Sequence, residues 1–152
     1  MIENNLTKAL EKFIADAVAD FRLPVQNGEM RAPKVIDGYL PPKRSGADDD
    51  FPFVVVRAEA GNVEEEMTTT TVSFIVGCYT KEVDGYRYCV NVMSRIRNAL
   101  TMLQNGILAN KYRLEFPIEW SLVADQPYPY WQLDMTTKWV YNTPQFKYEE
   151  EA

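Results

Sequence analysis

The sequence predicts an α+β domain, a two-layer sandwich in which two amphipathic helices cover one face of about four mainly antiparallel strands. Two segments repeat apolar residues every three or four positions, as amphipathic helices do. Four other segments alternate apolar and polar residues, which is typical of half-buried strands. The segments follow one another in the order α-β-β-α-β-β. At 152 residues, the chain has the length of a single domain (1–152), without a linker or an internal repeat.

The first predicted helix lies before Pro24. Its apolar residues recur at steps of three and four, namely Ile2, Leu6, Leu10, Phe13, Ala17 and Phe21. Charged residues take the opposite face, and the proline ends the helix. We expect this helix to pack on the sheet of its own chain. A terminal arm that binds a partner is the alternative, which stays open.

The second predicted helix begins after Asp84-Gly85. Its apolar stripe consists of Cys89, Val92, Met93, Ile96, Ala99, Leu100 and Leu103. Gly106 stands where a helix C-terminal cap is expected. Cys89 lies on this stripe and Cys78 on the apolar face of a strand, so we expect two buried thiols rather than a disulfide or a nucleophile.

The predicted strands form two antiparallel pairs. Residues 51–58 and 68–80 make the first pair, with turn residues at 60–62 and three glutamates near the hairpin tip. In the second pair, alternation predicts inward side chains at Tyr112, Leu114, Phe116, Ile118, Trp120 and Leu122, and after a turn at Trp131, Leu133, Met135, Thr137, Trp139 and Tyr141.

Two segments lack a periodic pattern. Residues 23–50 are rich in proline and glycine, and a loop longer than about 12–15 residues is usually functional or disordered. We expect this loop to be mobile in the isolated subunit. Its few apolar residues, Val35, Ile36, Tyr39 and Leu40, could form one short strand or anchor the loop. The tail, residues 146–152, ends in acidic residues and is expected to fray.

The charge balance excludes some classes of partner. The chain has 16 Lys and Arg against 22 Asp and Glu, a net charge of −6. Proteins that bind nucleic acid or anionic membranes need clustered basic residues, which this chain lacks. The longest apolar run, residues 51–56, is far short of the roughly 20 residues that span a bilayer. The N-terminal residues do not resemble a signal peptide, so we expect a cytoplasmic protein where it is made.

The sequence also lacks the usual catalytic constellations. It contains no histidine, which excludes Ser-His-Asp and Cys-His schemes and most zinc sites. The glycine spacing matches neither a dinucleotide-binding fingerprint nor a P-loop. The acidic runs, Asp48 to Asp50 and Glu64 to Glu66, lack the ligand spacing of a calcium loop. No catalytic residue, metal ligand or cofactor is predicted, and a structural or assembly component is favoured over an enzyme.

The C-terminal half resembles a known family. The stretches YRLEFPIEW (112–120) and DQPYPYW (125–131), preceded by PFVVVR (52–57) and the helix from Gly85 to Leu100, stand in one order. In this order and these motifs the chain is similar, over residues 51–144, to the tail terminator proteins of long-tailed bacteriophages. The resemblance implies a virion protein that caps the tail tube, stops its polymerisation and joins the tail to the head connector, as a ring around the DNA passage.

The same resemblance implies the partners. These are further copies of the chain in a hexameric ring, the tail tube protein and the head-tail connector protein, with no membrane and no specific DNA binding. The protein is then expected in the host cytoplasm during assembly and afterwards in the virion. Residues expected at subunit or partner contacts are Tyr39, Leu40, Lys43, Tyr128, Tyr130 and Trp131. Acidic residues that would line the passage, or else face bulk water, are Asp48, Asp49, Asp50, Glu64, Glu65 and Glu66.

Two other classes of function stay open. One is a different neck, head-tail joining or baseplate component of the same kind of particle. The other, less favoured, is a small-molecule-binding or enzymatic α+β domain with a pocket between the sheet and the tyrosine-rich loops. The sequence offers no nucleophile, base or metal site for the latter.

Overall fold

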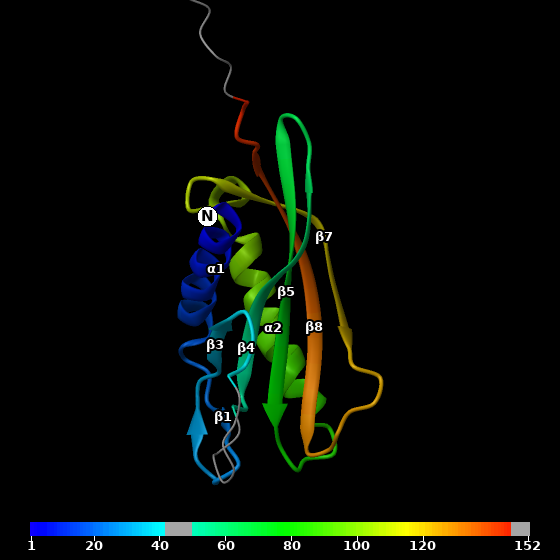
Figure 1. Cartoon of the computed structure of the whole chain (residues 1–152). Helices are drawn as coiled ribbons and strands as arrows, with labels where there is room; N and C mark the ends of the chain where they lie inside the picture. The colour runs from blue at the N-terminus through cyan, green and yellow to red at the C-terminus, as the bar shows by residue number, and fades with distance from the viewer. Residues whose placement is uncertain (42–49, 147–152) are drawn as a thin grey trace, which may run out of the picture.

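The computed structural model describes residues 1–41 and 50–146, and it confirms the α+β class and both helices (Figure 1). Helix α1 spans Ile2–Val18 and α2 spans Tyr86–Thr101. Both helices pack against the same face of one sheet and share one hydrophobic core with it. No helix in these described residues is both long and apolar enough to cross a membrane.

The main sheet has six strands, rather than the four predicted. They are β3 (Lys34–Asp37), β4 (Phe53–Val63), β5 (Met67–Tyr79), β6 (Ile107–Leu108), β7 (Tyr112–Leu122) and β8 (Tyr130–Asn142), in the spatial order β3-β4-β5-β8-β7-β6. Strand β3 is parallel to β4, and the other neighbours are antiparallel. Strands β1 (Leu23–Pro24) and β2 (Met30–Arg31) form a separate small sheet. The strands that the sequence pattern did not predict have two to four residues. Segments this short contain too few residues to show alternation of apolar and polar side chains.

The helices bury slightly different stripes from those predicted. In α2 the buried residues are Cys89, Val92, Met93, Ile96 and Leu100, all within the predicted set. In α1 the stripe runs through Leu6, Leu10, Ile14 and Val18. Phe13 and Ala17, which were predicted to point inward, lie at the border of this stripe and are half-buried. The buried residues of α1 are four positions apart, because residues i and i+4 lie above one another on one face of a helix.

Strand β7 departs from the predicted alternation. Leu114 is buried, but Phe116 is 71% exposed. The register against β8 shifts between Glu115 and Glu119, so the three residues 116–118 lie opposite the single residue Thr137. Such a bulge interrupts the ladder and redirects side chains, and Pro117 has no N–H to pair there. The prediction that Phe116 faces the core is therefore wrong.

The first hairpin is longer than predicted. Residues 60–62 were expected to form the turn, but Gly61 and Asn62 pair with Thr70 and Thr69, and β4 continues to Val63. The turn instead lies at Glu64–Glu66, where the Glu64 N–H donates to the carbonyl of Met67 at 2.9 Å. The tip of the distal half of this hairpin, residues 58–71, extends past the helices (Figure 1). We call this distal half the arm.

Much of the segment before β4 has defined structure. It contributes β1, β2 and β3. Strand β3 includes Val35 and Ile36 but not Tyr39 and Leu40, so it confirms the short strand in part. The Arg31 guanidinium donates to the carbonyls of Asp50 and Phe51 at 2.9 and 2.7 Å, which ties the segment to the start of β4. Residues 42–49 of the predicted mobile loop and residues 147–152 of the predicted frayed tail (146–152) lie outside the described residues.

Candidate interaction surface

The residues predicted to make contacts lie at separate places along the sheet. The β5–β8 pairing runs from Met67 opposite Asn142, at the arm, to Tyr79 opposite Tyr130, at the other end. At about 3.3 Å per residue, the two ends are roughly 40 Å apart. The acidic arm tip and the Tyr128–Trp131 turn therefore form two distinct surfaces, at opposite ends of the molecule (Figure 1).

Tyr39 and Leu40 lie at the end of β3. Gly38, with a φ of +98°, turns the chain out of the strand. The Arg57 guanidinium donates to the Gly38 carbonyl at 2.9 Å and lies 3.8 Å above the centre of the Tyr39 ring. Tyr39 is nevertheless 73% exposed. Lys43, which was predicted to act with these two residues, lies outside the described residues.

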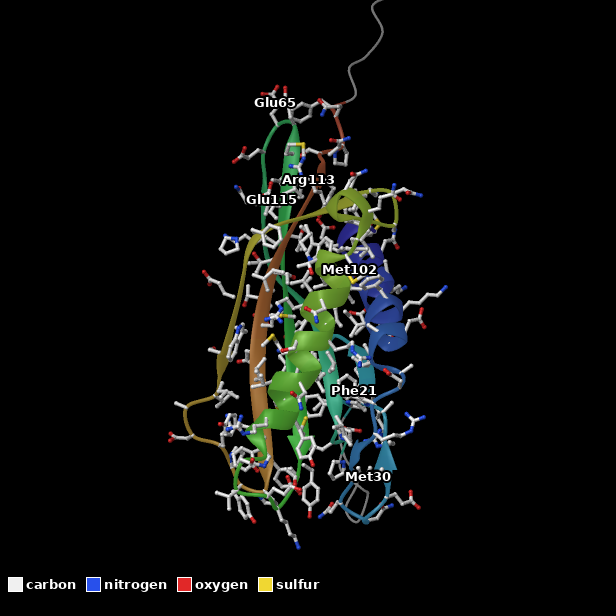
Figure 2. The ribbon with its side chains drawn as sticks, turned by 180° about the vertical axis from the view of Figure 1, so that it is seen from behind. Phe21, Met30, Glu65, Met102, Arg113 and Glu115 are labelled. Carbon is white, nitrogen blue, oxygen red and sulfur yellow. The ribbon has the colours of Figure 1, made fainter. Side chains whose placement is uncertain are left out.

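The two acidic runs have different surroundings. Asp48 and Asp49 lie outside the described residues. Asp50 is buried, and its carboxylate lies 3.4 Å from the Lys34 ammonium, so it serves an ion pair inside this chain. Glu64, Glu65 and Glu66 are all exposed at the arm tip, and Figure 2 shows Glu65 at the outer end of the molecule. In the described residues, the exposed carboxylates of the two runs are therefore those of the arm-tip glutamates.

The arm tip is braced by the segment that follows β8. The Thr143 N–H donates to the Glu66 carbonyl at 2.8 Å, and its hydroxyl donates to the Glu64 carbonyl at 2.7 Å. A hollow of about 560 Å³ lies between the tip and residues 143–146. Val63 and Phe146 line it and are 67% and 78% exposed, so apolar side chains border the acidic tip.

The predicted aromatic turn divides into exposed and buried parts. Tyr128 is exposed, and its hydroxyl donates to the Lys81 carbonyl at 2.7 Å. Tyr130 is half-buried, with its ring 4.8 Å from that of Phe51. Trp131 is buried, and its indole N–H donates to the Thr80 carbonyl at 3.0 Å. Tyr128 is thus the member of the turn that a partner can reach without rearrangement, while Trp131 belongs to the core.

Sequence reasoning missed the exposed aromatic residues of β7. Phe116 lies in the bulge, and Trp120, also predicted to be core, is 46% exposed. A proline inside an alternating strand, at position 117, is a signal that could have revealed them, because prolines in sheets are confined to edges and bulges. Exposed aromatic residues are typical of protein interfaces.

Both cysteines lie in the core as predicted. Cys78 and Cys89 are free and buried. The Cys89 thiol donates to the Val76 carbonyl at 3.8 Å. The hydrogen bond with Cys89, followed by burial, raises the pKa of the Cys78 thiol well above its usual range. No group of three or more His, Cys, Asp or Glu in the described part of the chain is placed to hold a metal ion.

No protein-family model matches the chain, and no curated protein shows significant sequence similarity to it.

Proposed function

We propose that this protein is a structural subunit of a long-tailed bacteriophage, a tail terminator that forms a ring on the end of the tail tube. The ring would stop tube polymerisation and join the tail to the head connector. The observation that carries the proposal is the arm. It extends the sheet beyond its helices and ends in three exposed glutamates beside exposed apolar side chains. Such an extension suits contact with a neighbouring protein better than support of the core.

The exposed aromatic residues support an assembly role. Tyr39, Phe116 and Tyr128 are 73%, 71% and 58% exposed, and they come from three different parts of the fold. A subunit that touches ring neighbours on both sides and a tube below needs several separate contact surfaces. Aromatic residues, which are enriched in protein interfaces, supply large contact areas for this purpose.

The arm-tip glutamates are proposed to face the DNA passage. An acidic wall repels the phosphate backbone and lets DNA slide, whereas lysine or arginine would hold it. The net charge of −6 agrees with this role. Asp50 is not part of the proposed wall, because it is buried against Lys34.

The test is tail assembly by the phage that carries this protein, with and without an intact copy of it. We expect particles that lack the protein to have tails of uncontrolled length that do not join heads. Purified protein added back should cap the tubes, with a ring visible at the tube end by electron microscopy. Tails of normal length that join heads without the protein would contradict the proposal.

The same experiment separates the other classes of function. Another neck or baseplate component would leave tube length unchanged but give particles that lack heads or fibres. A small-molecule-binding domain would leave tail assembly intact. A charge reversal of residues 64–66 to lysine tests the passage role: the particles should form and eject DNA more slowly, and unchanged ejection would place these glutamates away from the passage.

A further inference from the structure

The main sheet has two long strand edges that are unpaired in the described part of the chain. Strand β3 pairs with β4 only as far as Val56, which leaves the outer edge from Arg57 to Val63 without a neighbour. Strand β6 pairs only with Tyr112 and Arg113, which leaves the outer edge of β7 from Leu114 to Leu122. Unpaired edges present backbone N–H and C=O groups that readily pair with another chain.

The two edges lie at the same height in the sheet. Arg57 pairs with Ser73, Ser73 with Thr136, and Thr136 with Glu119, so the pairing across the sheet brings Arg57 level with Glu119. In the same way, the pairing sequence Ala60–Thr71–Lys138–Glu115 brings Ala60 level with Glu115. The strands β4 and β7 also run in opposite directions, because three antiparallel pairings separate them.

The irregularities of the two edges lie at the same height too. Between Arg57 and Ala60, β4 has two residues, Ala58 and Glu59, where its neighbour β5 has one. Between Glu115 and Glu119, β7 has three residues where β8 has one. A regular strand would fit poorly beside either bulge. Two edges whose bulges lie at the same height can pair along their whole length, because each bends where the other does.

The side chains of the two edges differ in size and charge. The β4 edge carries the small residues Ala58, Ala60 and Gly61, and the β7 bulge carries the exposed ring of Phe116. At the helix-covered end the β4 edge begins with Arg57, and the level position on the β7 edge is Glu119. Figure 2 shows Arg113 and Glu115 just below the arm tip. At the height of Arg57 and Glu119 the charges of the two edges are opposite in sign.

We infer that a second copy of this chain is the partner of both edges: the β4 edge of one copy pairs, antiparallel and level, with the β7 edge of the next. Arg57 then lies opposite Glu119 of the partner subunit, and the small β4 side chains accommodate the partner's Phe116. Because the two edges are different surfaces, the contact is heterologous and is repeated from copy to copy.

Pairing of the two edges at equal height determines whether the copies form a ring or a filament. A contact that shifts each copy along the strands builds a helical filament, whereas a contact without such a shift closes into a ring. Equal heights of the two edges favour the ring. This inference rests on the proposed function for the number of copies, and identifies the surfaces that its ring would use.

The experiment uses cysteine substitutions at an exposed and a half-buried position, Ala60→Cys and Glu115→Cys, in separate full-length proteins. A disulfide needs Cβ atoms about 3.5–4.5 Å apart, a separation close to that of directly opposed residues in antiparallel strands. The two proteins are mixed and oxidised, and covalent dimers are measured on a denaturing gel. The native thiols are buried and do not compete. A mixture of Ala60→Cys with Asn91→Cys, on the exposed face of α2, is the matched control.

We expect about ten-fold more dimer from the Ala60→Cys and Glu115→Cys mixture than from the control mixture. Neither protein alone should dimerise above the control. An equal dimer yield in both mixtures would overturn the inference, and so would self-dimers of Ala60→Cys, which indicate a two-fold contact. A cross-link without tube capping would contradict the proposed function but keep the edge contact. Tube capping without the cross-link would contradict the edge contact but keep the proposed function.

Discussion

Phe74 and Phe116 show how one residue type takes two roles on neighbouring parts of a sheet. Both lie on strands with alternating patterns, but Phe74 is fully buried and Phe116 is 71% exposed. We expect Phe74→Ala to lower the free energy of unfolding by about 3–5 kcal/mol, because it leaves a cavity in the core. Phe116→Ala should stay within about 0.5 kcal/mol in the monomer. Urea denaturation of both variants checks this; equal losses would contradict the β7 bulge.

The thiols give a second prediction at this scale. Hydrogen bonding and burial raise the pKa of Cys78, so its thiol stays protonated and unreactive at neutral pH. We expect neither Cys78 nor Cys89 to react with a thiol reagent in the native protein up to mildly alkaline pH. Both should react at once in denaturant. Rapid labelling of either cysteine under native conditions would contradict their place in the core.

Sequence reasoning was most successful for residues whose role depends on periodicity. It identified the buried stripe of α2 and the inward side of β8, because these residues follow one repeat; Val140, on the other face of β8, is buried against the pattern. It was wrong for Phe116, where the bulge breaks the repeat. It also could not find the ion pair of Asp50 with Lys34, because that contact depends on how the segment before β4 folds back.

The proposed function and the proposed edge contact both involve the arm. Its residues Ala58–Val63 are exposed, whereas Phe53–Val56, at the other end of β4, are buried. Local opening costs least where few apolar contacts must be broken. The length of the arm could not be predicted, since Ala60, Gly61 and Asn62 favour a turn in isolation. Pairing with β5 overrides that preference.

Hydrogen exchange tests the arm directly. In the monomer, we expect backbone amides of residues 58–63 to exchange at least about ten-fold faster than those of residues 53–56. In the assembled state, the proposed edge pairing should slow the exchange of residues 58–63 and of β7. The amides of α2, away from both edges, are the internal control. Slow exchange of residues 58–63 in a demonstrated monomer would contradict the exposed edge.

At the scale of the whole molecule, charge decides how the protein meets DNA. With a net charge of −6 and three glutamates at the arm tip, we expect no duplex DNA binding even at low salt, where attraction would be strongest. Fluorescence anisotropy with a labelled duplex measures this. The control is the variant with residues 64–66 changed to lysine, whose binding should rise and depend on salt. Tight, salt-sensitive binding by the unaltered protein would contradict an acidic passage.

The fold class and both helices were predictable from sequence, because each depends on patterns within one segment. The strand order was not, since it depends on which edges meet in space. The two open edges were hidden for the same reason: an edge is defined by the absence of a neighbouring strand, which alternation along one strand does not show.

The particle mass in solution shows whether this chain is a ring subunit. Light scattering on the purified protein, across a range of concentrations and with isolated tail tubes added, gives this mass. We expect a discrete assembly with six times the subunit mass, either in free solution or once tubes are present. A monomer that keeps its mass at every concentration, and stays unbound when tubes are added, would contradict the account.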